Sequence, residues 1–197
     1  MIEPLAVGLQ AAEKAKIIPG ESALVMGCGP IGLVIALTAL AGGCSKVFIA
    51  DIVSKKLEMC KNYNNLIPID LNKDNPAEIV KKNTNNWGAN IIFEASGATK
   101  AYDVIFDSIC PAGKVVIVGN PMNSIPMDFA TLLTKEIEIK TVFRYAHQYE
   151  RAINLLSSNK IDVKPMITDT VAFDDSIRAF ERAAKNLPED VKIQIQL

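Results

Sequence analysis

The stretch from Leu24 to Val34, LVMGCGPIGLV, places two glycines, a cysteine and a proline inside an apolar run. The run continues without a charge from Ala23 to Ser45, 23 residues that are nominally enough to cross a bilayer. However, Gly27, Gly29 and Pro30 would break a helix in its first third, and lipid offers no water to the freed backbone groups. The run therefore indicates a soluble protein, in which it forms a tight turn inside a core or a loop that holds a phosphate.

The composition is that of an ordinary globular chain. Of the 197 residues, 49% are hydrophobic and 22% charged, which suffices for one good core and an appended lobe. The formal net charge of -1 gives no overall attraction to nucleic acid or anionic lipid, so we expect neither partner and favour a small molecule. The start, MIEP, lacks the basic and apolar parts of a secretory signal, and we expect a cytoplasmic location.

The four cysteines are widely separated, form no C-x-x-C pair and are accompanied by one histidine in the whole sequence. A zinc cluster built from this chain alone is therefore not expected. We interpret the cysteines as reduced, cytosolic thiols. They are Cys28, Cys44, Cys60 and Cys110.

Short β-rich runs alternate with longer helical stretches between Glu21 and about Phe143, which is typical of a parallel sheet covered by helices. Several of these runs are apolar on both faces, as buried parallel strands are. The predicted strands are 23–26, 46–50, 66–69, 90–93, 114–118 and 136–142, and the predicted helices include 30–41, 54–63 and one that opens at Asn75 and Pro76. The pattern predicts an α/β fold with a doubly wound, six-stranded parallel sheet of the Rossmann type.

The pattern changes after Arg144. We predict a helix over 148–158, an extended stretch over 163–171 that Pro165 interrupts, a helix over 174–185 and a final alternating strand over 191–197. This tail does not obviously belong to the sheet.

Three glycines, Gly27, Gly29 and Gly32, form G-x-G-x-x-G between the first predicted strand and a helix that starts with Pro30 and Ile31. The first glycine permits a tight turn, the second lets the backbone approach a pyrophosphate, and the third lets the helix pack closely on the strand. The free N–H groups at the helix start then face the phosphates. The motif predicts a dinucleotide site, although a glycine turn without a ligand would look the same.

An acid follows the second predicted strand, 19 residues beyond Gly32. The carboxylate of Asp51 would accept hydrogen bonds from both ribose hydroxyls and repel a 2′-phosphate, so we predict NAD over NADP, softened by Lys55 and Lys56. Methyltransferases that bind S-adenosylmethionine share this geometry, but their loop usually follows an acid rather than an apolar pair. Cys28 is interpreted as a small residue that fills a crowded turn, or else as a reactive thiol.

At this point the sequence resembles the zinc-dependent medium-chain dehydrogenases, and within them the polyol branch that acts on sorbitol, xylitol or L-iditol. The resemblance extends over essentially all of the residues. Its motifs are Glu3-Pro4-Leu5, GCGPIG at 27–32, FEASG at 93–97, VIVG at 116–119, VFRY at 142–145 and DVKP at 162–165. The VFRY string is the most specific of them for the polyol branch.

The resemblance implies roles for particular residues. NAD would be held by Gly27, Cys28, Gly29, Pro30, Ile31, Gly32, Asp51 and Lys56, with Ser96 and Gly97 on its adenosine side and Val118, Gly119, Val142 and Phe143 near the nicotinamide. Arg144 and Tyr145 would face the hydroxyls of a polyol substrate, and Glu3 would stand beside the catalytic zinc. Taken singly, Glu3 could equally be a helix-start acid, Arg144 a surface cation and Tyr145 a half-buried aromatic.

Members of this family are about twice this size, and a separate domain supplies their Cys, His and acidic zinc ligands. The resemblance therefore implies a cofactor-binding half without a complete zinc site, inactive alone. Its expected parts are a linking helix (1–20), an NAD-binding domain (21–160) and a segment that returns to the catalytic domain (161–197). The strands of the segment 163–197 would expose edges and apolar faces that favour pairing with another copy, and the resemblance implies dimerisation near 125–142. We therefore expect a homo-oligomer, a dimer or tetramer. A non-catalytic dinucleotide binder and an oligomerising remnant are the alternatives.

Overall fold

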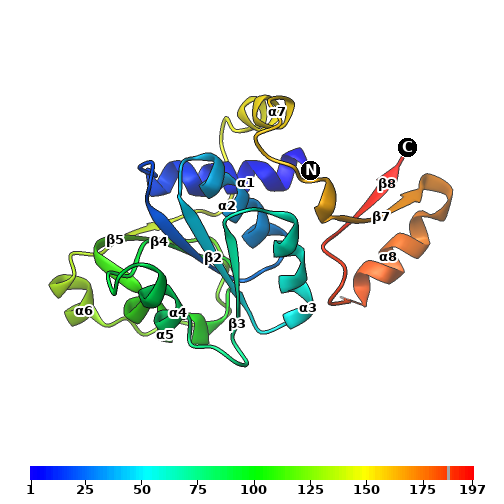
Figure 1. The fold of residues 1–197 in the computed structure, drawn as a ribbon. Coiled ribbons are helices and arrows are strands. Elements are labelled where there is room, and N and C mark those ends of the chain that lie inside the picture. Colours follow the sequence, from blue (N-terminus) through cyan, green and yellow to red (C-terminus); the bar gives the residue numbers. More distant parts are fainter. Residues whose placement is uncertain (186) are drawn as a thin grey trace.

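A computed structural model describes residues 1–185 and 187–197, and its main feature is a six-stranded parallel sheet (Figure 1). The strand order is β3-β2-β1-β4-β5-β6, so the chain winds outward from β1 in both directions, and the predicted doubly wound sheet is confirmed. Its strands are β1 (Ser22–Met26), β2 (Lys46–Asp51), β3 (Leu66–Asp70), β4 (Ala89–Glu94), β5 (Ile109–Ile117) and β6 (Glu138–Thr141).

Alternate residues of the central strands enter two separate cores, because successive side chains of a strand point to opposite faces. On β1, Val25 packs in the core that contains α1 and α2, whereas Leu24 packs in the core that contains α4 and α5. These helices are α1 (Ile2–Ala15), α2 (Pro30–Ala41), α4 (Pro76–Asn83) and α5 (Tyr102–Ser108). Both faces of the sheet are thus covered, and the carboxyl ends of the strands are left to the loops.

The helix α2 explains the long uncharged run. Pro30 occupies the first helical turn, where its missing N–H costs nothing, and Gly29 caps the helix with extended backbone. The helix has 12 residues and is buried along most of its length between α1 and the sheet. None of the helices in the described residues is long and apolar enough to pass through a membrane.

Some element boundaries differ from the prediction. The helix expected over 54–63 is α3 (Ser54–Leu57) continued by a 3-10 turn, η1 (Glu58–Asn62). The sixth strand begins at Glu138 because Glu136 adopts a φ of 52°, which no strand allows. The expected stretch from 163 begins instead with a 3-10 turn, η3 (Lys164–Met166), which holds Pro165 in its first turn. The remaining elements are η2 (Thr99–Ala101), α6 (Phe129–Thr134), α7 (Tyr149–Ser157) and η4 (Phe173–Asp175).

The C-terminal tail forms a small unit of its own. Strands β7 (Ile167–Ala172) and β8 (Lys192–Gln196) pair in parallel as a second, two-stranded sheet, apart from the main one as expected. The helix α8 (Ser176–Ala184) lies beside them (Figure 1). The guanidinium of Arg182, on this helix, bridges Asp169 at 2.7 Å and Asp190 at 2.6 Å.

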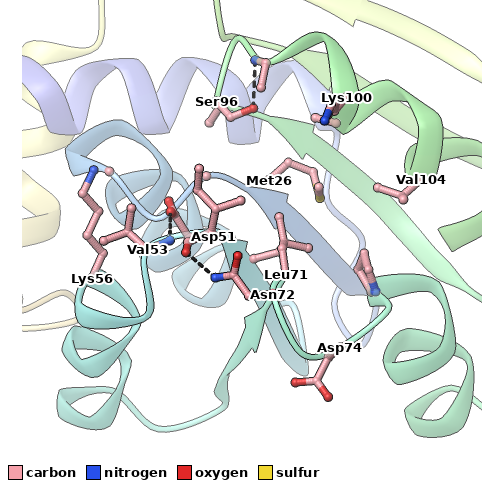
Figure 2. Close-up of a pocket in the computed structure, with 18 of the residues that line it drawn as sticks. Met26, Asp51, Val53, Lys56, Leu71, Asn72, Asp74, Ser96, Lys100 and Val104 are labelled. Atoms are coloured by element: carbon pink, nitrogen blue, oxygen red, sulfur yellow. Dashed lines mark hydrogen bonds between the residues drawn. The ribbon is translucent and has the colours of Figure 1, made fainter. Parts of the chain in front are cut away.

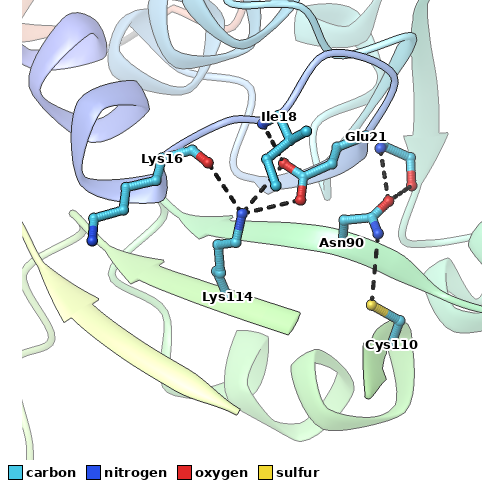
Figure 3. Close-up of polar contacts among 7 residues, drawn as sticks. Lys16, Ile18, Glu21, Asn90, Cys110 and Lys114 are labelled. Atoms are coloured by element: carbon cyan, nitrogen blue, oxygen red, sulfur yellow. Dashed lines mark hydrogen bonds and ion pairs between the residues drawn. The ribbon is translucent and has the colours of Figure 1, made fainter. Parts of the chain in front are cut away.

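A polar cluster lies at the amino-terminal ends of the central strands (Figure 3). The Lys114 ammonium donates to the Glu21 carboxylate at 3.0 Å and to the backbone oxygen of Lys16 at 3.2 Å. The same carboxylate accepts from the Ile18 N–H at 2.8 Å. The side chains of Lys114 and Glu21 are 17% and 14% exposed, so solvent screens this ion pair little. The cluster ties the chain that follows α1 to strand β5.

Replacing Lys114 with methionine is expected to lower the free energy of unfolding by about 1–3 kcal/mol, because the half-buried Glu21 carboxylate loses its counter-ion. Urea unfolding would measure the change. Lys55→Met is the control, since the ion pair of Lys55 with Glu58 is exposed and is expected to contribute below about 0.5 kcal/mol. Equal effects of the two substitutions would contradict the assignment.

Candidate functional site

A cavity of about 770 Å³ opens at the carboxyl ends of β1, β2 and β4 (Figure 2). The winding of the sheet reverses between β1 and β4, and open α/β sheets bind ligands at such a switch point. Five of the predicted site residues line the cavity: Gly27, Gly29, Asp51, Lys56 and Ser96. The cavity therefore collects residues from three separate loops that sequence reasoning had assigned to one ligand.

The three glycines of the loop have different surroundings. Gly27 has a φ of +103°, which favours glycine, and its N–H donates to the Ala50 oxygen at 2.7 Å. At Gly32, which begins the packing of α2 on the loop, a Cβ would lie 1.8 Å from the Gly27 oxygen. At Gly29, a Cβ would meet no heavy atom of the described residues within 4 Å. A side chain at Gly32 would thus collide with the loop itself, whereas Gly29, which lines the cavity, has free space where a side chain would begin.

Asp51, at the end of β2, is already anchored by the backbone. Its Oδ2 accepts from the Cys28 N–H at 2.7 Å, and its Oδ1 accepts from the Val53 N–H at 2.8 Å. Each carboxylate oxygen can accept a second hydrogen bond, so the group can still receive two hydroxyls of a ligand. Sequence reasoning assigned Asp51 to a ribose but missed that the same carboxylate also fixes the glycine loop.

Cys28 turns its side chain away from the cavity. It is fully buried in the core of α1 and α2, as expected of a small residue that fills a crowded turn, and its thiol donates to the Lys56 oxygen at 3.4 Å. Pro30, Ile31 and Gly32 lie in the first turn of α2. None of these four is among the residues that line the cavity in the described part of the chain.

Residues after β3 complete the cavity, and sequence reasoning did not assign them to the site. The Asn72 amide donates to the Ile52 oxygen at 2.6 Å, which braces the loop that follows Asp51 (Figure 2). The same amide donates to Asp70 at 3.0 Å. Hydrogen bonds from Ser54, Lys73 and Asn72 lower the pKa of Asp70. The apolar lining includes Met26, Leu71, Pro76, Ala101 and Val104. An apolar slot beside an anchored acid suits a flat ring attached to a sugar.

Glu94, at the end of β4, organises the wall on the other side. The side chain is fully buried, and its carboxylate accepts from the N–H groups of Ser96 at 2.8 Å and Gly97 at 3.0 Å and from the Ser96 hydroxyl. Its backbone oxygen accepts from Val118 at 2.8 Å and Gly119 at 2.9 Å. Glu94 thus joins the loops after β4 and β5. These loops carry four of the residues that are predicted to contact the cofactor.

The residues expected near a nicotinamide lie on the loops after β5 and β6 and, in the described chain, are not part of the cavity lining. Val142 is buried and donates its N–H to the Ile117 oxygen at 2.8 Å, which keeps the two loops together. Phe143 is 86% exposed, and the Arg144 guanidinium lies 5.5 Å from the centre of its ring. These side chains are free to contact a ligand or another part of a larger protein.

Glu3 and Tyr145 come from distant parts of the chain, and the charge of Glu3 lies near Tyr145, which precedes α7. The Tyr145 hydroxyl lies 3.0 Å from the Tyr149 hydroxyl, and the two rings pack edge to face with centroids 5.2 Å apart. The hydrogen bond with Tyr149, together with the negative charge of nearby Glu3, raises the pKa of Tyr145 to about 12. Tyr145 is therefore a neutral donor at physiological pH.

The described residues contain no group of three or more His, Cys, Asp or Glu side chains that could hold a metal ion. Glu3 is the residue that the family resemblance associates with zinc, and it belongs to no such group among the described residues. The donor set of these residues does not by itself fit a zinc site.

Comparisons with known proteins point to one family. Residues 30–158 match the family described as zinc-binding dehydrogenase. D-xylulose reductase of Morganella morganii is 44% identical over 187 residues, which cover 94% of this chain and 55% of that protein. Sorbitol dehydrogenase of Bacillus subtilis is 32% identical over 196 residues, which cover 99% of this chain and 56% of that protein. This chain therefore spans about half the length of the curated relatives it matches.

A solved structure shows the same likeness in three dimensions. An oxidoreductase/dehydrogenase of unknown specificity from Escherichia coli has a TM-score of 0.90 and 30% identity, and the match covers 100% of this chain and 57% of that one. The expected resemblance to the polyol branch is confirmed, and the methyltransferase alternative gains nothing from these matches. The chain belongs to the zinc-binding dehydrogenase family.

Proposed function

We propose that this chain is the NAD(H)-binding portion of a polyol dehydrogenase. The observation that carries the proposal is the anchored Asp51 carboxylate beside the open Gly29, on the cavity at the switch point of the sheet. The cavity supplies what a dinucleotide needs: backbone without side chains for the pyrophosphate, an acid for the ribose and an apolar slot for the adenine. The relatives named for D-xylulose and sorbitol support a polyol as substrate.

The charge around Asp51 favours NAD over NADP. A 2′-phosphate would lie against a carboxylate whose two oxygens are fixed by the Cys28 and Val53 N–H groups, so the acid cannot easily turn away. Lys56 lines the same cavity and reduces this discrimination without reversing it. A ribose with both hydroxyls free is the better partner for the site.

Bound NAD would supply the acceptor for a hydride from the alcohol carbon. The residues of this chain then have positioning roles: Val118, Gly119 and Val142 place the nicotinamide end at the edge of the sheet. Arg144 and the Tyr145 hydroxyl, a donor with a raised pKa, are available to bind hydroxyls of a polyol. No zinc-dependent step follows from these residues, because they do not form a metal site.

The experiment is calorimetric titration of the purified chain with NAD, NADH and NADP. We expect binding of NAD and NADH in the micromolar range and weaker binding of NADP. Asp51→Asn is expected to abolish measurable binding, while Asp74→Asn, which changes an exposed acid of the same cavity, leaves it within about threefold. Melting temperatures of both variants would show whether Asp51→Asn acts through a loosened loop. Equal affinity for NADP, or no binding by the folded wild type, would overturn the proposal.

We propose further that the described residues bind the cofactor but do not turn over substrate alone. The family zinc site needs ligands that these residues do not gather. The expected parts would be a linking helix (1–20), the NAD-binding domain (21–160) and a segment of the catalytic lobe (161–197).

A non-catalytic dinucleotide binder is the second candidate function. It would bind NAD and still lack dehydrogenase activity after a catalytic portion from a relative and zinc are added.

The chain is also proposed to form a homo-oligomer with a second copy along β6. This strand is at the edge of the sheet, and Phe129 and Leu133 on nearby α6 are 75% and 79% exposed. Light scattering at micromolar concentration tests the proposal, and a clean monomer would contradict it.

The four cysteines are free and buried, which supports a reducing compartment such as the cytoplasm.

A further inference from the structure

A second acid lies beside Asp51, at the end of the neighbouring strand. Asp70 is the last residue of β3 and the register partner of Asp51, and the N–H of Leu71 donates to the backbone oxygen of Asp51 at 3.1 Å. Neighbouring strands of a sheet lie about 4.8 Å apart, so the two acidic side chains start close together. The side chain of Asp70 is 12% exposed. The proposed function uses Asp51 and gives this second acid no role.

The Asp70 carboxylate is saturated by hydrogen bonds from two loops. Its Oδ2 accepts from the Ser54 hydroxyl at 2.7 Å and from the Lys73 ammonium at 3.0 Å. Its Oδ1 accepts from the backbone N–H of Asn72 at 3.1 Å and from the side-chain amide of Asn72 at 3.0 Å. Together these contacts use the acceptor sites of both oxygens. They also hold the pKa of Asp70 well below its usual range, so the group is an anion at neutral pH.

Through these contacts, Asp70 fixes the loop that follows Asp51. Ser54, which donates to Asp70, is the first residue of α3, and the Asn72 amide also donates to the Ile52 oxygen at 2.6 Å (Figure 2). Ile52 and Asn72 line the cavity together with Asp51. The conformation of the loop beside the proposed ribose site therefore depends on Asp70, which is not among the residues that line the cavity in the described chain.

Asp70 also occupies two groups that could otherwise bind a phosphate. Hydroxyl and ammonium groups are common donors to phosphate oxygens in proteins. Lys73 lines the same cavity as Asp51, but its ammonium is bound to Asp70. The Ser54 hydroxyl is bound to Asp70 as well. A phosphate placed beside Asp51 would therefore find both donors already held by a carboxylate.

We propose that Asp70 is a positioning residue that makes the cavity prefer NAD over NADP. It keeps Ser54 and Lys73 bound, and it adds a second carboxylate beside the ribose acid. A 2′-phosphate carries nearly two negative charges and would be repelled by both acids without gaining either donor. The free 2′-hydroxyl of NAD needs neither donor, because Asp51 can accept its hydrogen bond. The inference rests on the proposed NAD site and adds to it a residue that does not touch the cofactor.

The experiment compares the affinities of NAD and NADP for Asp70→Asn by calorimetric titration. Asparagine has nearly the same shape, but it removes the charge that holds the Lys73 ammonium. We expect NADP to bind about tenfold more tightly than it binds the wild type, while the affinity for NAD changes by less than about threefold. Adenosine 2′,5′-bisphosphate, which carries the same 2′-phosphate, should gain as much as NADP.

Asp74→Asn is the matched control. It removes one negative charge from an exposed acid of the same cavity, and this acid holds neither Ser54 nor Lys73. We expect the ratio of the two affinities to stay within about threefold of the wild type. The same shift in Asp74→Asn as in Asp70→Asn would overturn the proposal, because the net charge of the cavity would then suffice. A loss of affinity that is equal for NAD and NADP in Asp70→Asn, or unchanged affinities, would overturn it as well.

A second set of variants asks whether the released lysine causes the gain. Adding Lys73→Met to Asp70→Asn should remove most of the gain for NADP, whereas adding Lys82→Met, at an exposed lysine in the last turn of α4, should keep it. Thermal unfolding checks the fold, and Asp70→Ser, which is also neutral, replaces Asp70→Asn if that variant does not fold. If the wild type binds neither nucleotide, the proposed function fails and this inference fails with it. If the wild type prefers NAD and the neutral variants keep that preference, the inference alone fails.

Discussion

Alanine at Gly29 is expected to leave the fold unchanged and to weaken NAD binding at least about tenfold. The residue has extended backbone with a φ of -81°, and a Cβ there meets no atom of the described residues within 4 Å. Alanine can therefore be accommodated without strain in the free protein. In the complex, the same methyl group would occupy the side of the loop from which the pyrophosphate must approach the backbone N–H groups.

Two measurements on Gly29→Ala separate these effects. Thermal unfolding of the free variant should match the wild type within about 2 °C. Calorimetric titration with NAD should show the loss of affinity, and a shorter ligand such as adenosine, which has no pyrophosphate, should lose much less. Wild-type affinity for NAD in this variant would mean that the phosphates do not approach the loop at Gly29. The anchored Asp51 would then need another interpretation.

The sheet could be predicted because each of its strands can be recognised from a few neighbouring residues in the sequence. Each buried strand is a short apolar β-rich run, and the loop after β1 carries its own glycine spacing. The strand ends were less certain because they depend on single backbone conformations, such as the left-handed Glu136 before β6. Proline in the first turn of η3 likewise replaced an expected extended stretch by a 3-10 turn.

The second half of the site could not be predicted in the same way. In the sequence, Glu94 is simply the last residue of a predicted strand motif. In the structure, β4 lies between β1 and β5, and the carboxylate and backbone oxygen of Glu94 join two loops. Asn72 braces the loop after β2 across the pairing of β2 with β3. The charge of Glu3 acts on Tyr145, although the two residues are far apart in the sequence. Such roles depend on tertiary contacts, and for Glu3 and Tyr145 a family resemblance was the sole signal.

Gly32→Ala is expected to have the opposite profile to Gly29→Ala, although the two residues share one loop. A Cβ at Gly32 would lie 1.8 Å from the Gly27 oxygen and 2.9 Å from its carbonyl carbon, so α2 must move away from the strand. Backbone atoms cannot rotate aside as a side chain can, and the displacement breaks packing along a helix buried on both sides. We expect the free energy of unfolding to fall by about 3 kcal/mol or more.

Urea unfolding without any nucleotide measures the effect of Gly32→Ala, with Gly29→Ala as the matched control. If both variants lose stability equally, the loop is uniformly strained and the open face at Gly29 does not exist. If Gly32→Ala is as stable as the wild type, α2 can withdraw from β1 at little cost. In that case the close approach at Gly32 cannot be what holds the start of α2 against the loop. The two variants together thus separate the glycine that permits packing from the glycine that is proposed to permit nucleotide binding.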